Sequence, residues 1–182
     1  MALADFIASC RSANERDDHF GALALALTIP EICAACTDPG TSKSRARYVQ
    51  WWATFVQPRH TYFDMCNLTA EDAYLLRCSF LHAGTDQLEG KRSGEVLQRV
   101  VFTSSGFGNP NSHLVDVNGV LQIDVAMFVE EVLAGVTEWM AQTASDESVQ
   151  LNLSGLVSIH DMRIGPLRLG NVAIASSVTP QS

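Results

Sequence analysis

Apolar residues recur at helical spacing along much of the sequence, and this periodicity decides the fold class. Residues 124–142, "DVAMFVEEVLAGVTEWMAQ", follow a cap at Asp124 and place the following residues on one face of a helix: Val125, Phe128, Val129, Val132, Val136 and Trp139. Residues 44–58, "SRARYVQWWATFVQP", do the same with Tyr48, Trp51, Trp52, Phe55 and Val56. Both stripes predict helices that bury their aromatic face in a shared core.

Three further helices are expected upstream of residue 90. Residues 2–12 are amphipathic, and residues 17–29 begin with two acids that complement a helix dipole. Thr28 and Glu31 form a capping-box pattern with Pro30 in the first turn, which predicts a separate short turn after that helix. The third helix starts at the capping-box pair Thr69 and Asp72 and stops at Gly84.

A β-rich segment interrupts the helices. Residues 96–103, "VLQRVVFT", are rich in β-branched residues, and residues 113–124, "HLVDVNGVLQID", carry Asn-Gly between two short β runs, which is a strong hairpin signal. Beyond residue 145, alternating apolar residues mixed with Gly and Pro suggest extra strands or an arm over a partner.

The expected fold is therefore mainly α (α+β). We predict a helical bundle from about 1–90 and 124–142, a small antiparallel β-hairpin or sheet from about 95–123, and an irregular or β segment from about 145–182. The length of 182 residues fits a single domain.

Composition indicates the class of protein and the cellular compartment. Hydrophobic residues make up 47 % and charged residues 18 %, as in a folded globular chain. No apolar run reaches the roughly 18 residues that span a bilayer, and the first residues lack a basic leader with an apolar core, so we expect a cytoplasmic protein that does not engage a membrane. Five cysteines at irregular spacing fit reduced thiols better than disulfides.

Charge is distributed unevenly along the chain. The net charge is −8, which argues against a broad nucleic-acid-binding surface. Residues 40–100, however, contain eight Lys and Arg against six Asp and Glu, so this segment is +2 and the remainder is −10. An anionic ligand should therefore meet the middle of the chain.

The helix ending at Gly84 carries the best functional candidates. Within "DAYLLRCSFLHAG", residues 72–84, Arg77 and His82 stand on an otherwise mostly apolar segment. Five residues separate their directions by ~140° in an α-helix, but a long Arg side chain can swing round so that both groups converge on one anion. The structural alternative is that Arg77 pairs with an acid while His82 caps the end of the helix.

The stretch "RCSFLH", residues 77–82, resembles the motif of the HEPN superfamily (higher eukaryotes and prokaryotes nucleotide-binding), in which Arg is followed by four to six residues and His near the end of a helix. The resemblance implies an all-α bundle that forms a homodimer and acts on RNA or nucleotide, in many members as a metal-independent endoribonuclease of prokaryotic toxin, defence or phage-related systems. By the same resemblance, Arg77 would hold the scissile phosphate and His82 would transfer a proton. Cys78 stands directly after the Arg, where the family usually has a polar residue.

A zinc site is one alternative to this hypothesis. Cys33 and Cys36 have zinc-knuckle spacing, and His60 with Cys66 could supply a second pair, but an apolar, Ala-rich setting favours buried thiols. We therefore expect no metal and no cofactor.

A second class of function is a non-catalytic, homo-oligomeric structural or adaptor protein that binds another protein. Its signal is the alternation of Leu151, Leu153, Val157 and Ile159, which would offer a strand edge to a partner. His113, at the end of a Gly-rich loop, is expected to face solvent, and Glu130 and Glu131 are expected on a solvated helix face.

Overall fold

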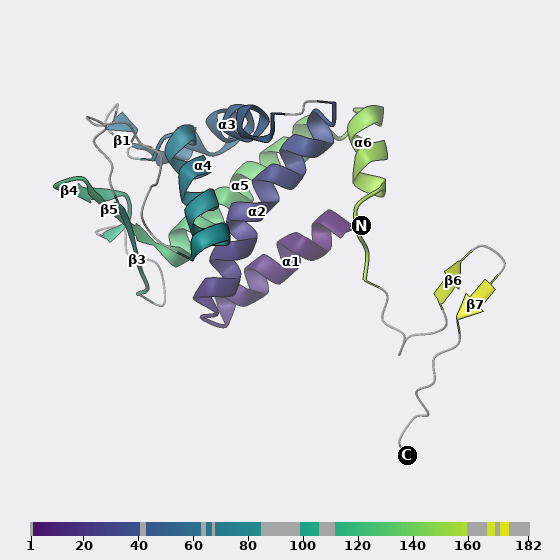
Figure 1. Cartoon of the computed structure of the whole chain (residues 1–182), viewed down its shortest axis with the longest axis horizontal. Helices are drawn as coiled ribbons and strands as arrows, with labels where there is room; N and C mark the ends of the chain where they lie inside the picture. The colour runs from purple at the N-terminus through teal and green to yellow at the C-terminus, as the bar shows by residue number, and fades with distance from the viewer. Residues whose placement is uncertain are drawn as a thin grey trace, which may run out of the picture.

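The chain folds into a helical bundle with a small sheet at one end, as seen in a computed structural model (Figure 1). The structure describes residues 2–40, 43–62, 65–66, 68–84, 99–105, 112–159, 167–169 and 172–174. Its elements are α1 (Ala2–Glu15), α2 (His19–Thr37), α3 (Ser44–Phe55), η1 (Gln57–His60), β1 (Thr61–Tyr62), β2 (Met65–Cys66), α4 (Ala70–Cys78), η2 (Ser79–Ala83), β3 (Arg99–Thr103), β4 (Val115–Val117), β5 (Val120–Asp124), α5 (Val125–Gln142), α6 (Glu147–Ser154), β6 (Leu167–Leu169) and β7 (Val172–Ile174). The predicted mainly α fold with a small β insertion is confirmed.

Helix α2 runs through the middle of the bundle. It contacts α1, α3, α5 and α6, and nine of its residues are buried. The separate turn predicted after Thr28 is wrong, because α2 continues through Pro30 to Thr37. The Thr28 hydroxyl donates to the Ala24 carbonyl (2.6 Å) instead of capping a new helix, and burial of Ile29 and Pro30 holds the helix together across the missing N–H.

By length and hydropathy, α2 is also the one described helix that could cross a bilayer. This is weak support for a membrane span, because the central helix of a bundle passes the same test. Half of its most apolar stretch is buried against the other helices of the bundle.

Helices α3 and α5 confirm the two predicted aromatic stripes. Trp52 of α3 is fully buried, with its ring centre 5.8 Å from Tyr48 and 6.1 Å from Phe128 of α5. The aromatic residues of α3 therefore build core and do not offer stacking rings to solvent. Gly135 lets α5 approach the end of α3 closely, since a Cβ there would lie 2.6 Å from the Phe55 carbonyl oxygen.

The predicted hairpin is formed by β4 and β5. Asn118 and Gly119 both adopt positive φ (57° and 79°), as a type I′ turn requires, and the strands pair antiparallel. β3 then joins the other side of β5 in parallel, which makes the sheet mixed. Asp124 ends β5 and caps α5 through a hydrogen bond from the Met127 N–H (3.1 Å), so the sheet leads directly into the bundle.

The region beyond residue 145 differs from the prediction. Asp146 caps α6 by accepting from the Ser148 and Val149 N–H groups, so Leu151 and Leu153 lie on a helix and not on a strand. Asn152 fastens α6 to α2 through the Cys36 carbonyl (2.8 Å). Strands appear only later, where β6 and β7 pair antiparallel.

Candidate functional site

Helix α4 begins at the predicted capping box, and the segment that continues it ends at the predicted Gly84. Thr69 accepts a hydrogen bond from the Asp72 N–H, and the Asp72 carboxylate accepts in return from Thr69, which completes a capping box. The Ala70 N–H also donates to Gln57 Oε1 (2.9 Å). At the far end, Gly84 closes the segment with φ 64°, a left-handed conformation that suits glycine.

The last turn before Gly84 is a π-helix. It covers Ser79–Ala83, and the Gly84 N–H reaches the carbonyls of both Phe80 and Ser79. A π-turn closes over five residues, so it turns by a smaller angle per residue than an α-helix. The side chains of Arg77 and His82 therefore point in more similar directions around the helix axis than they would in an uninterrupted α-helix. Single π-turns are rare and are found frequently at functional sites. Local sequence signals do not reveal such a turn.

Arg77 lies half-buried where α4 meets α3. Its guanidinium carbon is 5.8 Å from the ring centre of Tyr48, and Nε has no hydrogen-bond partner among the described residues. No carboxylate in the described part of the chain pairs with it, so the structural alternative of an Arg77 ion pair is not seen there. The cation packs against an aromatic face, and its buried Nε makes no hydrogen bond to the described residues.

Other polar atoms around Arg77 also lack partners. The Tyr48 hydroxyl and Glu31 Oε2 are buried without a hydrogen bond among the described residues. Burial raises the pKa of Tyr48, Arg77 opposes that rise, and Glu31 adds to it. Both charged side chains therefore lie close enough to Tyr48 to act on it electrostatically. Helices α2, α3 and α4 thus meet around Tyr48, where these polar atoms have no partner among the described residues.

His82 is exposed on the π-helix. Within the described ranges it makes no hydrogen bond or ion pair. An exposed imidazole is free to exchange a proton with a bound substrate. The two predicted site residues are therefore neighbours along one helix with different settings: a half-buried cation followed by an accessible imidazole.

Cys78 faces Tyr74 on the same helix. Burial and a hydrogen bond with the Cys78 thiol raise the pKa of Tyr74. Tyr74 in turn contacts the edge of Tyr48, with ring centres 5.7 Å apart at 64°. The Cys78 thiol therefore belongs to the packing around Arg77.

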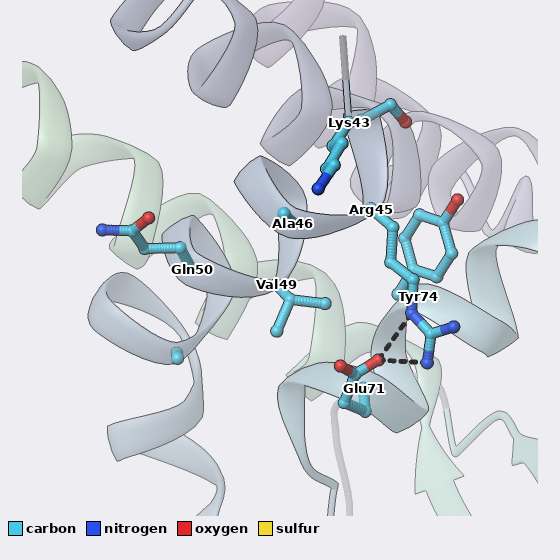
Figure 2. Close-up of a pocket in the computed structure, with 9 residues that line it drawn as sticks. Lys43, Arg45, Ala46, Val49, Gln50, Glu71 and Tyr74 are labelled. Carbon is cyan, nitrogen blue, oxygen red and sulfur yellow. Dashed lines mark hydrogen bonds and ion pairs between the residues drawn. The ribbon is translucent and has the colours of Figure 1, made fainter. Parts of the chain in front are cut away.

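A groove opens beside this packing on the outer face of α3 (Figure 2). It encloses about 750 Å³ and is lined by Lys43, Ser44, Arg45, Ala46, Val49, Gln50, Ala53, Glu71 and Tyr74. Figure 2 shows Arg45 reaching from α3 to Glu71 and Tyr74 of α4. Neither Arg77 nor His82 lines the groove, but Tyr74 connects it to the Arg77 junction.

A second polar cluster is buried at the other side of α3. Glu131 Oε2 lies 2.9 Å from Nε2 of both His60 and His113, and both imidazoles are almost fully buried. The contact with His113 is a hydrogen bond, whereas the contact with His60 is an ion-pair contact without one. The expectations of a solvent-facing His113 and a solvated Glu131 are wrong, because the turn before β4 folds back onto α5.

The two cysteines with zinc-knuckle spacing lie in α2. Cys33 and Cys36 are buried, and burial raises the pKa of both thiols, which keeps them protonated. No group of three or more His, Cys, Asp or Glu residues in the described ranges is arranged to hold a metal ion. The side chain of Cys66 lies outside the described residues.

Comparisons with protein-family models, with curated proteins and with solved structures found no match for this chain. Support for a function therefore comes from the residues of the site.

Proposed function

We propose that this chain is a HEPN-like RNA-processing or nucleotide-binding protein, and specifically a metal-independent endoribonuclease that uses Arg77 and His82. The observation that carries the proposal is the state of Arg77. Its guanidinium rests on the Tyr48 ring with an unpartnered Nε and no carboxylate partner among the described residues, one π-turn before an exposed His.

These groups match the needs of RNA cleavage by its own 2′-hydroxyl. A base removes the proton of the 2′-hydroxyl, the oxygen attacks phosphorus, and an acid protonates the departing 5′-oxygen to leave a 2′,3′-cyclic phosphate. Arg77 would stabilise the charge on the phosphorane, and His82 would move the proton. One His per chain cannot readily serve as base and acid in the same step, so the proposal includes a homodimer that brings two His82 side chains together.

The test is RNA cleavage in EDTA with analysis of product ends. Wild type should yield 2′,3′-cyclic phosphates, and His82→Ala should lose about 10²- to 10⁴-fold in rate, the usual contribution of acid–base groups. Because His82 is exposed, its loss should change the free energy of unfolding by less than about 1 kcal/mol. His19→Ala, at the start of α2, is the matched control and should cleave normally. A folded wild type that cuts none of several RNAs would contradict the proposal.

One observation favours the alternative, a non-catalytic homo-oligomeric adaptor. Leu151, Val157 and Ile159 are exposed (72 %, 71 % and 96 %), and a groove of about 480 Å³ lies beside them between α2 and α6. Exposed apolar side chains of this kind mark protein-binding surfaces. If cleavage is absent, Leu151→Glu should then disrupt self-association measured by light scattering.

A further inference from the structure

The groove on α3 has the chemistry of a nucleotide subsite. Its floor is the apolar stripe Ala46, Val49 and Ala53, spaced to lie along one face of the helix. Its rim carries Lys43 and Arg45. A volume of about 750 Å³ is within the ordinary range for small-ligand sites and is ample for one nucleotide.

The charges of the groove favour an anion. Arg45 is paired with Glu71 through Nε (3.0 Å) and Nη2 (2.8 Å), which neutralises much of its charge and fixes its guanidinium 5.7 Å from the Tyr74 ring centre. Lys43 is exposed and has no acidic partner among the described residues. The groove therefore retains one exposed cation without an acidic partner among the described residues, and lysine commonly contacts phosphate as a point charge.

The groove lies next to the Arg77 junction. Tyr74 lines the groove and packs against the buried Tyr48 ring, which the Arg77 guanidinium also contacts. Tyr74 and Arg77 are one turn apart on α4. A single-stranded nucleic acid whose scissile phosphate sits at Arg77 would place its neighbouring nucleotide in the groove.

We propose that this groove binds the nucleotide next to the scissile phosphate of a single-stranded RNA, with Lys43 on its phosphate and the Ala46–Ala53 stripe under its base. This inference rests on the proposed function and adds a specificity subsite to it. It implies that longer RNA strands bind better than a dinucleoside monophosphate, which has no second phosphate for Lys43 to contact.

Binding can be measured without cleavage in full-length His82→Ala protein, by fluorescence anisotropy of a labelled eight-nucleotide RNA at low salt. Lys43→Glu should weaken binding by at least about tenfold and lower the slope of log affinity against log salt by about one. Ala53→Glu places a carboxylate on the floor at an exposed position and should also weaken binding. Arg16→Glu is the control and should bind normally, because Arg16 is an exposed residue just after α1 whose side chain bonds only Ser12 among the described residues.

In the active protein, Lys43→Glu should raise KM for the eight-nucleotide RNA, leave kcat unchanged, and leave cleavage of a dinucleoside monophosphate, which has no second phosphate, unaffected. Cleavage by wild type with Kd and KM unchanged in both groove variants would overturn the subsite while the nuclease stands. RNA binding that depends on Lys43 without any cleavage would retain the subsite and refute the nuclease. Absence of RNA binding, or preference for an acidic peptide over RNA, would overturn the subsite.

Discussion

Glu131 shows how a single side chain can hold two distant parts of this chain together. Burial alone would raise the pKa of Glu131, but contacts with His113 and His60 outweigh it and lower the pKa to about 2. The carboxylate therefore stays ionised between the two imidazoles. We predict that Glu131→Gln lowers the free energy of unfolding by about 2 to 3 kcal/mol, as expected for charge-assisted hydrogen bonds, measured by urea denaturation at neutral pH.

The same cluster predicts a pH dependence. Because the folded pKa of Glu131 lies below its ordinary value of 4.5, its contribution is complete above pH 4.5 and is lost as pH falls toward 2. Wild type should therefore lose more stability than Glu131→Gln across that interval. Glu130→Gln, the exposed neighbour on α5, is the control and should follow the wild-type curve. Parallel curves for wild type and Glu131→Gln would contradict this assignment.

Sequence reasoning missed this cluster for a physical reason. His60 and His113 come from η1 and from the turn before β4, and nothing in the local pattern indicates that both lie against α5. Arg77 and His82, by contrast, could be selected because they share one helix and interrupt an apolar segment. The surroundings of these two side chains could not be predicted, because Arg77 contacts Tyr48 on another helix and no sequence signal marks the π-turn.

At the scale of elements, the close crossing of α5 over the end of α3 depends on Gly135. A Cβ at this position would meet the Phe55 carbonyl oxygen at 2.6 Å and Val56 Cγ2 at 2.9 Å, and the first of these is backbone that cannot rotate away. Gly135→Ala gains about 1 kcal/mol of helix propensity but must separate the two helices. We predict a net loss of about 2 kcal/mol, measured by thermal and urea unfolding.

The control is Gly40→Ala, where an added Cβ meets nothing within 4 Å. This change should be neutral or slightly stabilising, because it only restricts the unfolded chain. Equal stability of Gly135→Ala and wild type would show that α3 and α5 can move apart freely.

Elements with strong local signals were predictable, and those decided by distant packing were not. The aromatic stripe of α3, the capping box of α4 and the Asn-Gly hairpin each follow from a few adjacent residues. α6 was missed because its apolar alternation resembles a strand, while the Asp146 cap and the bond from Asn152 to Cys36 select a helix. Pro30 was misread because burial overrides its tendency to end a helix.

At the scale of the whole molecule, the proposed nuclease requires two chains at one site. Each chain offers a single exposed His82 beside Arg77, whereas the reaction uses a base and an acid. A symmetric dimer supplies both from the same surface patch of each subunit. Inactive subunits should therefore disable their wild-type partners and not merely dilute them.

This can be measured by refolding wild type with His82→Ala in equal amounts and comparing RNA cleavage with wild type at the same total concentration. If both His82 side chains are needed, only dimers of two wild-type chains are active, and random pairing leaves about one quarter of the activity. If each chain acts alone, about one half remains. Refolding with the control variant His19→Ala, a half-buried residue at the start of α2, should retain full activity. A value near one half would argue that His82 of a single chain completes the reaction, and the dimeric site would then be wrong even if cleavage itself depends on His82.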